Sequence, residues 1–469
     1  CFYQRRALQL LLDPQFGFHP HWHPRSRHRR FPDVQTRVKI YMSNWYLPPC
    51  PSADDVDDRV RFTYHQERQT LAVSVNVSHN EDAFDTYTLN SDIKPDLPLF
   101  LRRDVVDTCL LSDTWFNAYR WIELTFWKKS RITDHFVDHQ GMRPYCEDAL
   151  EILSFARQIT QQETNHIRRY LKATSANQGL PILAQFGDEP TSHLQHIKVP
   201  YFKKFRTRVD LPELYRVTMP PEAGGIDDPD SQQCTSTRPR MFLKGDAPVY
   251  SPILWVLRRT RHFGGLSQIP AMDTAWEAKE DKAVWRGTLT GIRAISVNDS
   301  DYVNCMKMLR CRVTYKYDES SLVDAGLAHK WPTFPATING RSLVKGFVSV
   351  SEQLRCKAII ILEGNDVATG LKWALLSRSV VMMPPPTVTS WLMEEILEPW
   401  VHYIPLDKDG SNAEERVQWM IDNDEKTRKI AERATLFMYD LMFHPEADAD
   451  DIQVKTEIMR RYQAYFVQS

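Results

Sequence analysis

In the C-terminal half of the chain, short apolar runs alternate with segments of helical period. From Lys357 the order is strand, helix, strand, loop, a helix over 389–397 and a strand over 400–406. An earlier strand within 272–293 ends in Arg-Gly-Thr, and a helical region around 306–309 follows it. Strands that alternate with helices are typical of a doubly wound parallel sheet. The pattern therefore predicts an α/β fold.

The N-terminal half has weaker patterns. Two β-rich runs, 37–47 and 70–78, predict neighbouring strands. Apolar residues at helical spacing over 148–172 predict an amphipathic helix that packs on a sheet, and 113–127 is the best helix candidate in an aromatic segment. A buried strand is expected within 180–190, where it stops at a glycine, an aspartate and a proline.

The length of 469 residues exceeds what one compact core needs, so we expect two large domains. Three helical segments close the chain, and the last is expected to pack back on the N-terminal domain. The predicted divisions are a basic flexible stem, an N-terminal domain with irregular insertions, a C-terminal domain and a closing helix, at 1–34, 35–270, 271–445 and 446–469.

The stem contains the stretch HPHWHPRSRHRR, which has no apolar period. Its histidines His19, His21 and His23 are candidate metal ligands. No carboxylate or cysteine lies beside them and prolines separate them, so a flexible basic stem is favoured. We predict no metal site in this chain.

Composition narrows the class of protein. The apolar content of 42% and the charged content of 25% are ordinary for a globular protein. Lys plus Arg (59) nearly balance Asp plus Glu (60), which argues against a nucleic-acid partner. No apolar run reaches the roughly 18 residues of a membrane helix. The chain starts at Cys1 rather than at a methionine, so we leave room for a missing N-terminal signal or membrane anchor.

Cysteines and glycosylation sequons bear on the compartment. The eight cysteines include no Cys-x-x-Cys pair, which disfavours a zinc ribbon or a thioredoxin-like site. Their even number fits disulfides and also fits reduced core thiols. The sequons at 76–78 and 298–300 fit a secretory route. We therefore expect the lumen of the secretory pathway, in the endoplasmic reticulum or the Golgi.

Ligands of open α/β sheets bind beyond the carboxyl ends of strands. Three segments fit that position, namely 187–189, 286–291 and 363–366. In the first, Asp188 ends a predicted strand and is a candidate general base, which would take a proton from an acceptor hydroxyl. The alternative is a turn aspartate that caps the following segment.

The second segment suits a pyrophosphate. Backbone N–H groups at Gly287, the hydroxyls of Thr288 and Thr290, and the guanidinium groups of Arg286 and Arg293 can together neutralise and desolvate two adjacent anionic groups. The alternative is a strand that ends at a capped helix whose arginines face water.

In the third segment, Gly364 lets the backbone approach a ligand, and Asn365 or Asp366 is expected to cap a helix that begins near Val367. The positive end of this helix would face the same crevice. The sequence contains neither Gly-x-Gly-x-x-Gly nor Gly-x-x-x-x-Gly-Lys-Ser/Thr, which disfavours dinucleotide oxidoreductases and P-loop enzymes.

Two charged residues complete the candidate donor site. Glu363 could accept hydrogen bonds from a ribose diol, and Lys372 could reach a phosphate. A paired surface carboxylate and a solvated lysine are the alternatives.

The three segments, in this order, resemble glycosyltransferase family 90, which includes fungal capsule-associated glycosyltransferases and animal protein O-glucosyltransferases. The resemblance runs from about Leu180 to the C-terminus, and the Pro-Trp-Val-His-Tyr core is its most specific string. Its motifs are QFGDEP, VWRGTLTG with Trp276 and Lys279 upstream, CKAIIILEGNDVATGLKW, LLSRSVVMM and EPWVHYIPL.

The resemblance implies a GT-B architecture, in which two Rossmann-like domains face a cleft and the C-terminal one holds the sugar nucleotide. The domain at 35–270 would then be the acceptor-side domain, and the domain at 271–445 would be the donor domain. It implies inverting transfer of a sugar from a UDP-sugar to a hydroxyl of a glycan or protein. Xylose and glucose are the favoured sugars. Asp188 would be the base, and neither a metal nor another cofactor would take part. The implied donor-binding residues are Trp285, Arg286, Gly287, Thr288, Thr290, Arg293, Glu363, Gly364, Asn365, Asp366 and Lys372.

The chain departs from the family pattern at two positions. Leu289 and Gly370 stand where protein O-glucosyltransferases have arginines, and Arg293 and Lys372 could supply the lost charges. The departures keep open a catalytically inactive GT-B relative that binds a glycan or nucleotide as a chaperone or interaction module. A bacterial-type transferase that builds cell-surface polysaccharide in the cytoplasm is a third hypothesis.

Overall fold

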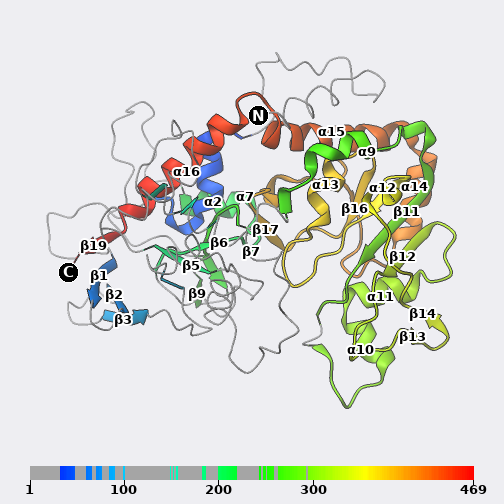
Figure 1. The fold of residues 1–469 in the computed structure, drawn as a ribbon, viewed down its shortest axis with the longest axis horizontal. Helices are drawn as coiled ribbons and strands as arrows, with labels where there is room; N and C mark the ends of the chain where they lie inside the picture. The colour runs from blue at the N-terminus through cyan, green and yellow to red at the C-terminus, as the bar shows by residue number, and fades with distance from the viewer. Residues whose placement is uncertain are drawn as a thin grey trace, which may run out of the picture. The chain divides into compact units, whose positions relative to one another are not determined.

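The computed structural model shows two compact units, which hold residues 260–448 and residues 33–259 with 449–469 (Figure 1). They overlap the donor domain and the acceptor-side domain predicted from the sequence, so we call them the donor-side unit and the acceptor-side unit. The functional assignment in these names stays a prediction, and we describe each unit by itself. The described residues are 32–47, 60–65, 70–76, 84–89, 99–100, 148, 151–152, 155–156, 182–185, 199–218, 242–244, 247–249, 251–257, 262–291 and 294–468. Residues 1–31 of the predicted stem, with its histidines, lie outside these ranges, as do the helix at 113–127 and most of the helix at 148–172.

The donor-side unit is built on a five-stranded sheet in which every neighbouring pair is parallel. The predicted α/β class is therefore confirmed for this unit. Across the sheet the strands are β12 (Val323–Leu327), β11 (Glu280–Gly287), β15 (Cys356–Ile360), β16 (Val380–Met383) and β18 (Ile404–Pro405).

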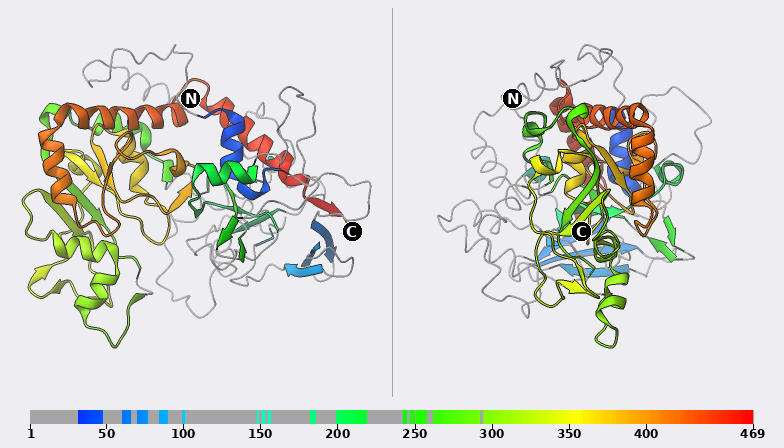
Figure 2. Two further views of the ribbon diagram at one scale, coloured as in Figure 1. Left: turned by 180° about the vertical axis from the view of Figure 1, so that it is seen from behind. Right: turned by 90° about the vertical axis from the view of Figure 1, so that its right-hand side faces the viewer.

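Helices cover both faces of this sheet (Figure 2). On one face, alternate strand residues such as Trp285 and Ile360 form one core with α10, α11 and α14. On the other face, Ile361 and Met383 meet Leu371 of α13, and α15 packs against α13 and β16. A sheet buried on both faces explains the continuous apolar runs at 358–362 and 380–383. These helices are α10 (Asp301–Lys307), α11 (Leu309–Lys316), α13 (Gly370–Leu376), α14 (Ala413–Asp422) and α15 (Asp424–Met442).

The strand order places a topological switch point between β11 and β15. The first strand in the chain, β11, lies between the second, β12, and the third, β15, and the later strands β16 and β18 follow β15 in order across the sheet. The chain leaves β11 toward α10 and α11 on one face and leaves β15 toward α13 on the other. The two connections separate at the carboxyl ends of these neighbours, and such a crevice is where doubly wound proteins bind ligands.

Two predictions in this unit need correction. The segment 389–397 is not a helix but the end of strand β17 (Val388–Ser390) and a 3₁₀ turn (Glu394–Ile396), because Met393 adopts a left-handed φ of 61°. The strand predicted over 400–406 shortens to β18, because Trp400 at φ 63° belongs to a turn. The smaller elements here are α9 (Ile269–Met272), β13 (Thr337–Ile338), β14 (Arg341–Ser342) and α12 (Val350–Gln353).

The acceptor-side unit contains two further four-stranded sheets. In one, β10 (Ile253–Leu254), β6 (Phe202–Lys203) and β5 (Leu183–Gln185) are parallel, and β4 (Leu99–Phe100) is antiparallel to β5. In the other, β1 (Val60–His65) pairs with β19 (Phe466–Gln468) and β2 (Thr70–Asn76), and β2 pairs with β3 (Phe84–Leu89). The strands predicted within 70–78 and 180–190 are thus present, as β2 and β5.

The predicted strand over 37–47 is wrong, because these residues form α2 (Val34–Met42) and a 3₁₀ turn (Ser43–Trp45). Asp33 caps the helix by accepting a hydrogen bond from Thr36 N–H at 2.8 Å. Residues Arg37, Val38, Ile40, Tyr41 and Met42 are all buried. A helix covered on most sides shows no amphipathic period, so its apolar pattern resembles that of a strand.

The closing helix α16 (Ala447–Gln463) has most of its residues in the acceptor-side unit. The Tyr462 hydroxyl accepts a hydrogen bond from Leu183 N–H at 3.1 Å, and Arg461 donates to Tyr46 O at 2.7 Å. The C-terminal residues therefore pack within the same unit as the N-terminal helix α2. The remaining elements of this unit are β7 (Phe205–Thr207), α7 (Leu211–Thr218), β8 (Phe242–Lys244) and β9 (Ala247–Val249).

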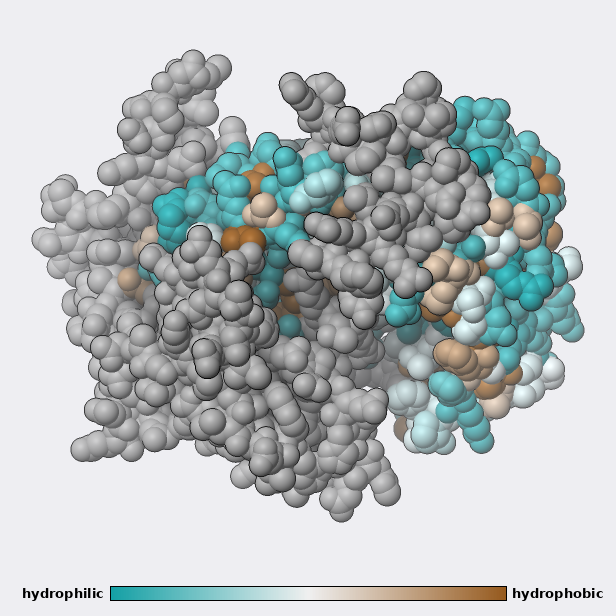
Figure 3. Space-filling view, turned by 45° about the horizontal axis from the view of Figure 1, so that its top comes forward, coloured by the Kyte–Doolittle hydropathy of each residue, from teal (hydrophilic) through white to brown (hydrophobic). Residues whose placement is uncertain are grey.

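On the face shown in Figure 3, the coloured surface is largely hydrophilic with small separate hydrophobic spots. Within the described ranges, no helix combines the length and the apolar character that a membrane span requires.

His402, in the Pro-Trp-Val-His-Tyr string, is expected to make the stability of the fold depend on pH. Its Nδ1 accepts a hydrogen bond from Glu398 N–H at 3.1 Å, and burial lowers its pKa below the ordinary value. The unfolded chain therefore takes up this proton at a higher pH than the folded chain, and stability falls as pH decreases through about 6.5. We expect His402→Asn, which keeps an acceptor, to flatten this slope in urea unfolding between pH 7 and pH 5. His329→Asn, at an exposed position, is the control, and equal slopes for both variants would contradict the assignment.

Candidate functional site

The loops that follow β11 and β15 meet at the switch point. Gly291 N–H donates to Asn365 Oδ1 at 3.4 Å. A Cβ added to Gly364 would lie 3.2 Å from Thr290 Cγ2. The structure thus brings together the second and third segments singled out in the sequence.

Arg310 of α11 links these loops. Its Nη1 donates to Thr288 O at 3.0 Å, its Nη2 to Leu362 O at 2.9 Å and its Nε to Glu363 O at 3.2 Å. Burial lowers its pKa to about 10, and the carboxylate of Asp366 opposes that shift. The group therefore stays protonated at neutral pH, and a positive charge is fixed between the two loops.

Two glycines make this approach of the chain to itself geometrically feasible. A Cβ on Gly364 would lie 2.9 Å from Arg310 Nη2, and a Cβ on Gly287 would lie 2.7 Å from Trp285 Cζ2. The Trp285 ring is buried, with the Arg310 guanidinium carbon 5.9 Å from its centroid. The two glycines thus leave room for the side chains of Trp285 and Arg310. Their lack of a Cβ would also let a ligand approach the backbone.

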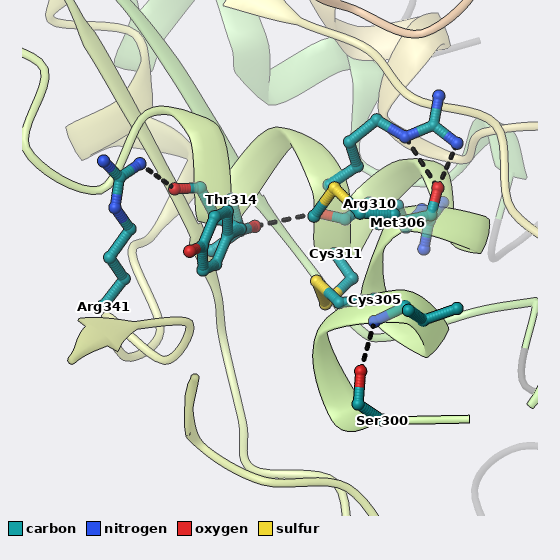
Figure 4. The surroundings of a disulfide bond; sticks show 10 residues. Ser300, Cys305, Met306, Arg310, Cys311, Thr314 and Arg341 are labelled. Atoms are coloured by element: carbon teal, nitrogen blue, oxygen red, sulfur yellow. Dashed lines mark hydrogen bonds between the residues drawn. A yellow bond between two sulfur atoms is a disulfide. The ribbon is translucent and has the colours of Figure 1, made fainter. Parts of the chain in front are cut away.

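A disulfide holds the helix that carries Arg310. Cys305 of α10 bonds to Cys311 of α11, and both cysteines are fully buried (Figure 4). Thr314 Oγ1 donates to Arg310 O at 2.9 Å one turn further on. Cys356 is a free thiol, and the other five cysteines lie outside the described residues.

Glu363 has partners of its own. It accepts hydrogen bonds from Thr387 N–H at 2.8 Å, from the Thr387 hydroxyl and from Val388 N–H at 3.3 Å. Burial raises its pKa, and the hydrogen bonds from Thr387 and Val388 act against that shift. In this arrangement the Glu363 carboxylate stabilises the segment that follows β16 through these hydrogen bonds.

Beside Glu363 lies a cavity of about 150 Å³ at the carboxyl ends of β15 and β16. Its wall is mainly apolar, from Ile361, Leu371, Met383 and the three prolines 384–386. Glu363, Glu394 and Lys408 are its charged lining residues.

Of the three basic residues predicted to hold phosphates, the two that the structure describes, Arg286 and Lys372, each have a carboxylate partner. Arg286 Nη2 lies 2.7 Å from Asp324 Oδ2, and its side chain is 7% exposed. Lys372 is buried, and its Nζ lies 3.5 Å from Glu394 Oε1. For either residue to bind a phosphate, the ligand would have to compete with this ion pair, and both roles stay predictions.

The predicted cap of the helix after β15 is wrong. The helix α13 begins at Gly370 rather than near Val367, and its N-cap residue Thr369 makes no side-chain cap hydrogen bond. Asn365 instead receives the N–H of Gly291, and the backbone carbonyl of Asp366 accepts from Gly364 N–H at 3.3 Å. The loop is therefore longer than expected and folds on itself before the helix starts.

Asp188 and Arg293 lie outside the described residues, so their roles also stay predictions. Of the two threonines, Thr288 is exposed and Thr290 is partly buried. In the described part of the chain, no group of three His, Cys, Asp or Glu side chains is placed to hold a metal ion.

Comparison with known proteins bears on the same region. Residues 265–446 match the family model of glycosyl transferase family 90. The resemblance predicted from the motifs is thereby confirmed for these residues. They include both switch-point loops, Arg310 and the disulfide.

Named relatives match over similar lengths. The chain is 32% identical to O-glucosyltransferase LpsA of Dichelobacter nodosus over 163 residues, which are 35% of this chain and 44% of the relative. It is 30% identical to protein O-glucosyltransferase 2 of Danio rerio over 158 residues, 33% of this chain and 28% of the relative. It is 31% identical to uncharacterized protein 027R of Frog virus 3 over 196 residues, 37% of this chain and 19% of the relative. The chain thus spans less than half the length of these relatives.

Arg310 tests the structural basis of the site. A lysine ammonium cannot reach three carbonyl oxygens in different directions, so we expect Arg310→Lys to lower the free energy of unfolding by about 2 kcal/mol or more, as lost hydrogen bonds to a charged group do. The control is Arg341→Lys, which loses a hydrogen bond to Tyr315 O and is expected to cost about 1 kcal/mol or less. Urea unfolding gives both values, and equal costs would show that Arg310 does not join the loops.

Proposed function

We propose that the protein is an inverting glycosyltransferase that moves a sugar from a UDP-sugar to a hydroxyl of a glycan or protein. The observation that carries this proposal is the meeting of the loops 286–291 and 362–366 at the switch point of a parallel sheet, with Arg310 between them. These loops lie in the family 90 region. The names of two relatives, both O-glucosyltransferases, favour glucose or a related sugar such as xylose.

In this proposal the molecule is a GT-B enzyme whose donor-side unit holds the nucleotide. Support comes from the sheet of the donor-side unit and from the parallel strands β5, β6 and β10 of the acceptor-side unit. Asp188 follows β5 by three residues, so it lies in the segment that leaves the carboxyl end of a parallel strand. That position suits a general base for the acceptor hydroxyl.

The departing diphosphate gains negative charge in the transition state, and fixed donors must balance it. The backbone N–H groups of the two loops, the Thr288 hydroxyl and the charge of Arg310 are the candidates in the described chain. Arg286 could join them by exchanging Asp324 for a phosphate. The proposed mechanism therefore takes its leaving-group stabilisation from the protein and uses no metal ion.

The second candidate is a catalytically inactive GT-B relative that binds a glycan or nucleotide. Specific observations favour it: Leu289 is 2% exposed in the core, and Arg286 and Lys372 are both paired with carboxylates. Turnover of a UDP-sugar above background separates this candidate from the first. The lumen of the secretory pathway is the proposed place of action, since Cys305 and Cys311 form a disulfide.

Asp188→Asn tests the proposed base. We expect the variant to keep UDP binding and to lose about 10²- to 10⁴-fold in sugar transfer, because general-base catalysis is commonly of that size. Glu189→Gln is the matched control at the adjacent position and should retain most transfer. Transfer is measured as UDP release that depends on an acceptor, and near-normal transfer by Asp188→Asn would remove this residue from the role.

Donor binding without a metal is tested by thermal unfolding with UDP in EDTA. A ligand at about 100 times its Kd adds roughly 2.7 kcal/mol to the stability of the folded state. We expect UDP to raise Tm equally with EDTA and with Mn²⁺, and CMP to have a smaller effect. A shift that appears only with Mn²⁺ would contradict the metal-free mechanism.

A further inference from the structure

One surface feature near the N-terminus of α10 is unrelated to the proposed donor site. Residues 296–300 form a tight turn in which Asp299 N–H donates to Ser296 O at 3.2 Å. Asn298 lies in this turn with its side chain exposed. Asn298, Asp299 and Ser300 make up one of the two Asn-x-Ser/Thr sequons of the chain.

Residues of α10 stabilise this turn through hydrogen bonds and an ion pair. The buried side chain of Asn304 receives Ser296 N–H at 2.9 Å and donates to Ser296 O at 2.9 Å. Lys307 pairs with Asp299 at 2.5 Å. These contacts use the residues on either side of Asn298 and leave its carboxamide on the solvent side of the turn.

The residues around Asn298 also expose apolar surface. Val297 is 97% exposed, Val303 is 42% exposed and Tyr302 is 41% exposed. These three exposed apolar side chains lie within seven residues, so they are gathered rather than scattered singly over the surface. A bulky hydrophilic group attached at Asn298 would lie beside them and shield them.

The same helix pair carries a disulfide. Cys305 and Cys311 are bonded within α10 and α11, close to Ser300 at the start of α10 (Figure 4). Disulfides persist in oxidising compartments such as the secretory lumen, where N-linked glycans are also attached. The bond is an observation independent of the sequon, and both point to the same compartment.

We infer that Asn298 is an N-glycosylation site whose glycan covers the apolar residues beside it. The carboxamide Nδ2 forms a bond to C1 of the first sugar of a lipid diphosphate-linked oligosaccharide. The bond from C1 to the diphosphate oxygen breaks, the lipid diphosphate leaves with the electron pair, and Nδ2 gives up one proton to the modifying enzyme. The inference does not rest on the proposed transferase activity, so either can fail without the other.

The role of Ser300 allows a sharp control. Its Oγ accepts a hydrogen bond from Val303 N–H at 3.3 Å and caps α10, and threonine can do the same. Ser300→Thr therefore keeps both the sequon and the cap, whereas Ser300→Ala removes both. Asn298→Gln removes the acceptor and leaves the cap in place.

The test is expression of the full chain, in an Asn76→Gln background, through a eukaryotic secretory pathway. The secreted protein is treated with peptide N-glycosidase in ¹⁸O water and the peptides are sequenced by mass spectrometry. We expect ¹⁸O-labelled aspartate at position 298 in the parent and in Ser300→Thr, and no label in Asn298→Gln or Ser300→Ala. Recovery of the parent peptide with unmodified Asn298, from protein whose Cys305–Cys311 bond is intact, would overturn the inference.

Discussion

The buried guanidinium of Arg310 connects two loops that the chain forms more than fifty residues apart. Its three hydrogen bonds end on the carbonyl groups of Thr288, Leu362 and Glu363. Carbonyl groups at the ends of parallel strands have no ladder partner, and a positive charge with several donors satisfies them without a carboxylate. The same charge can then act, through space, on an anion bound at the switch point.

The rest of the donor-side unit keeps this residue in place. The sheet fixes the ends of β11 and β15 side by side, because Ala283 pairs with Ala358 and Val284 with Ile359. The Cys305–Cys311 bond joins α10 to α11 immediately beside Arg310. Lys279, next to the start of β11, is buried and donates hydrogen bonds to Asp273 and Ser379, so this motif residue upstream of the loop stabilises the sheet.

The sequence could predict the position of the loops but not the group that joins them. A glycine and polar residues after an apolar run indicate the end of a parallel strand. This pattern predicted the loops at 286–291 and 363–366. Arg310 stands in an ordinary helical stretch, and its role depends on a tertiary contact that has no local pattern. The ion pair between Lys372 and Glu394 is also a tertiary contact, so the sequence could not predict it. Apolar periodicity predicted the wrong secondary structure at two places. These are the turn at Met393, which has a left-handed backbone, and the buried helix at 34–42.

Hydrogen exchange of the whole protein with and without UDP tests the central claim most directly, because it locates the ligand on the chain. If the nucleotide binds at the switch point, the amides of 287–291 and 363–366 become protected, together with the segment around Arg310. Protection confined to other segments, with these loops unchanged at saturating UDP, would contradict the account.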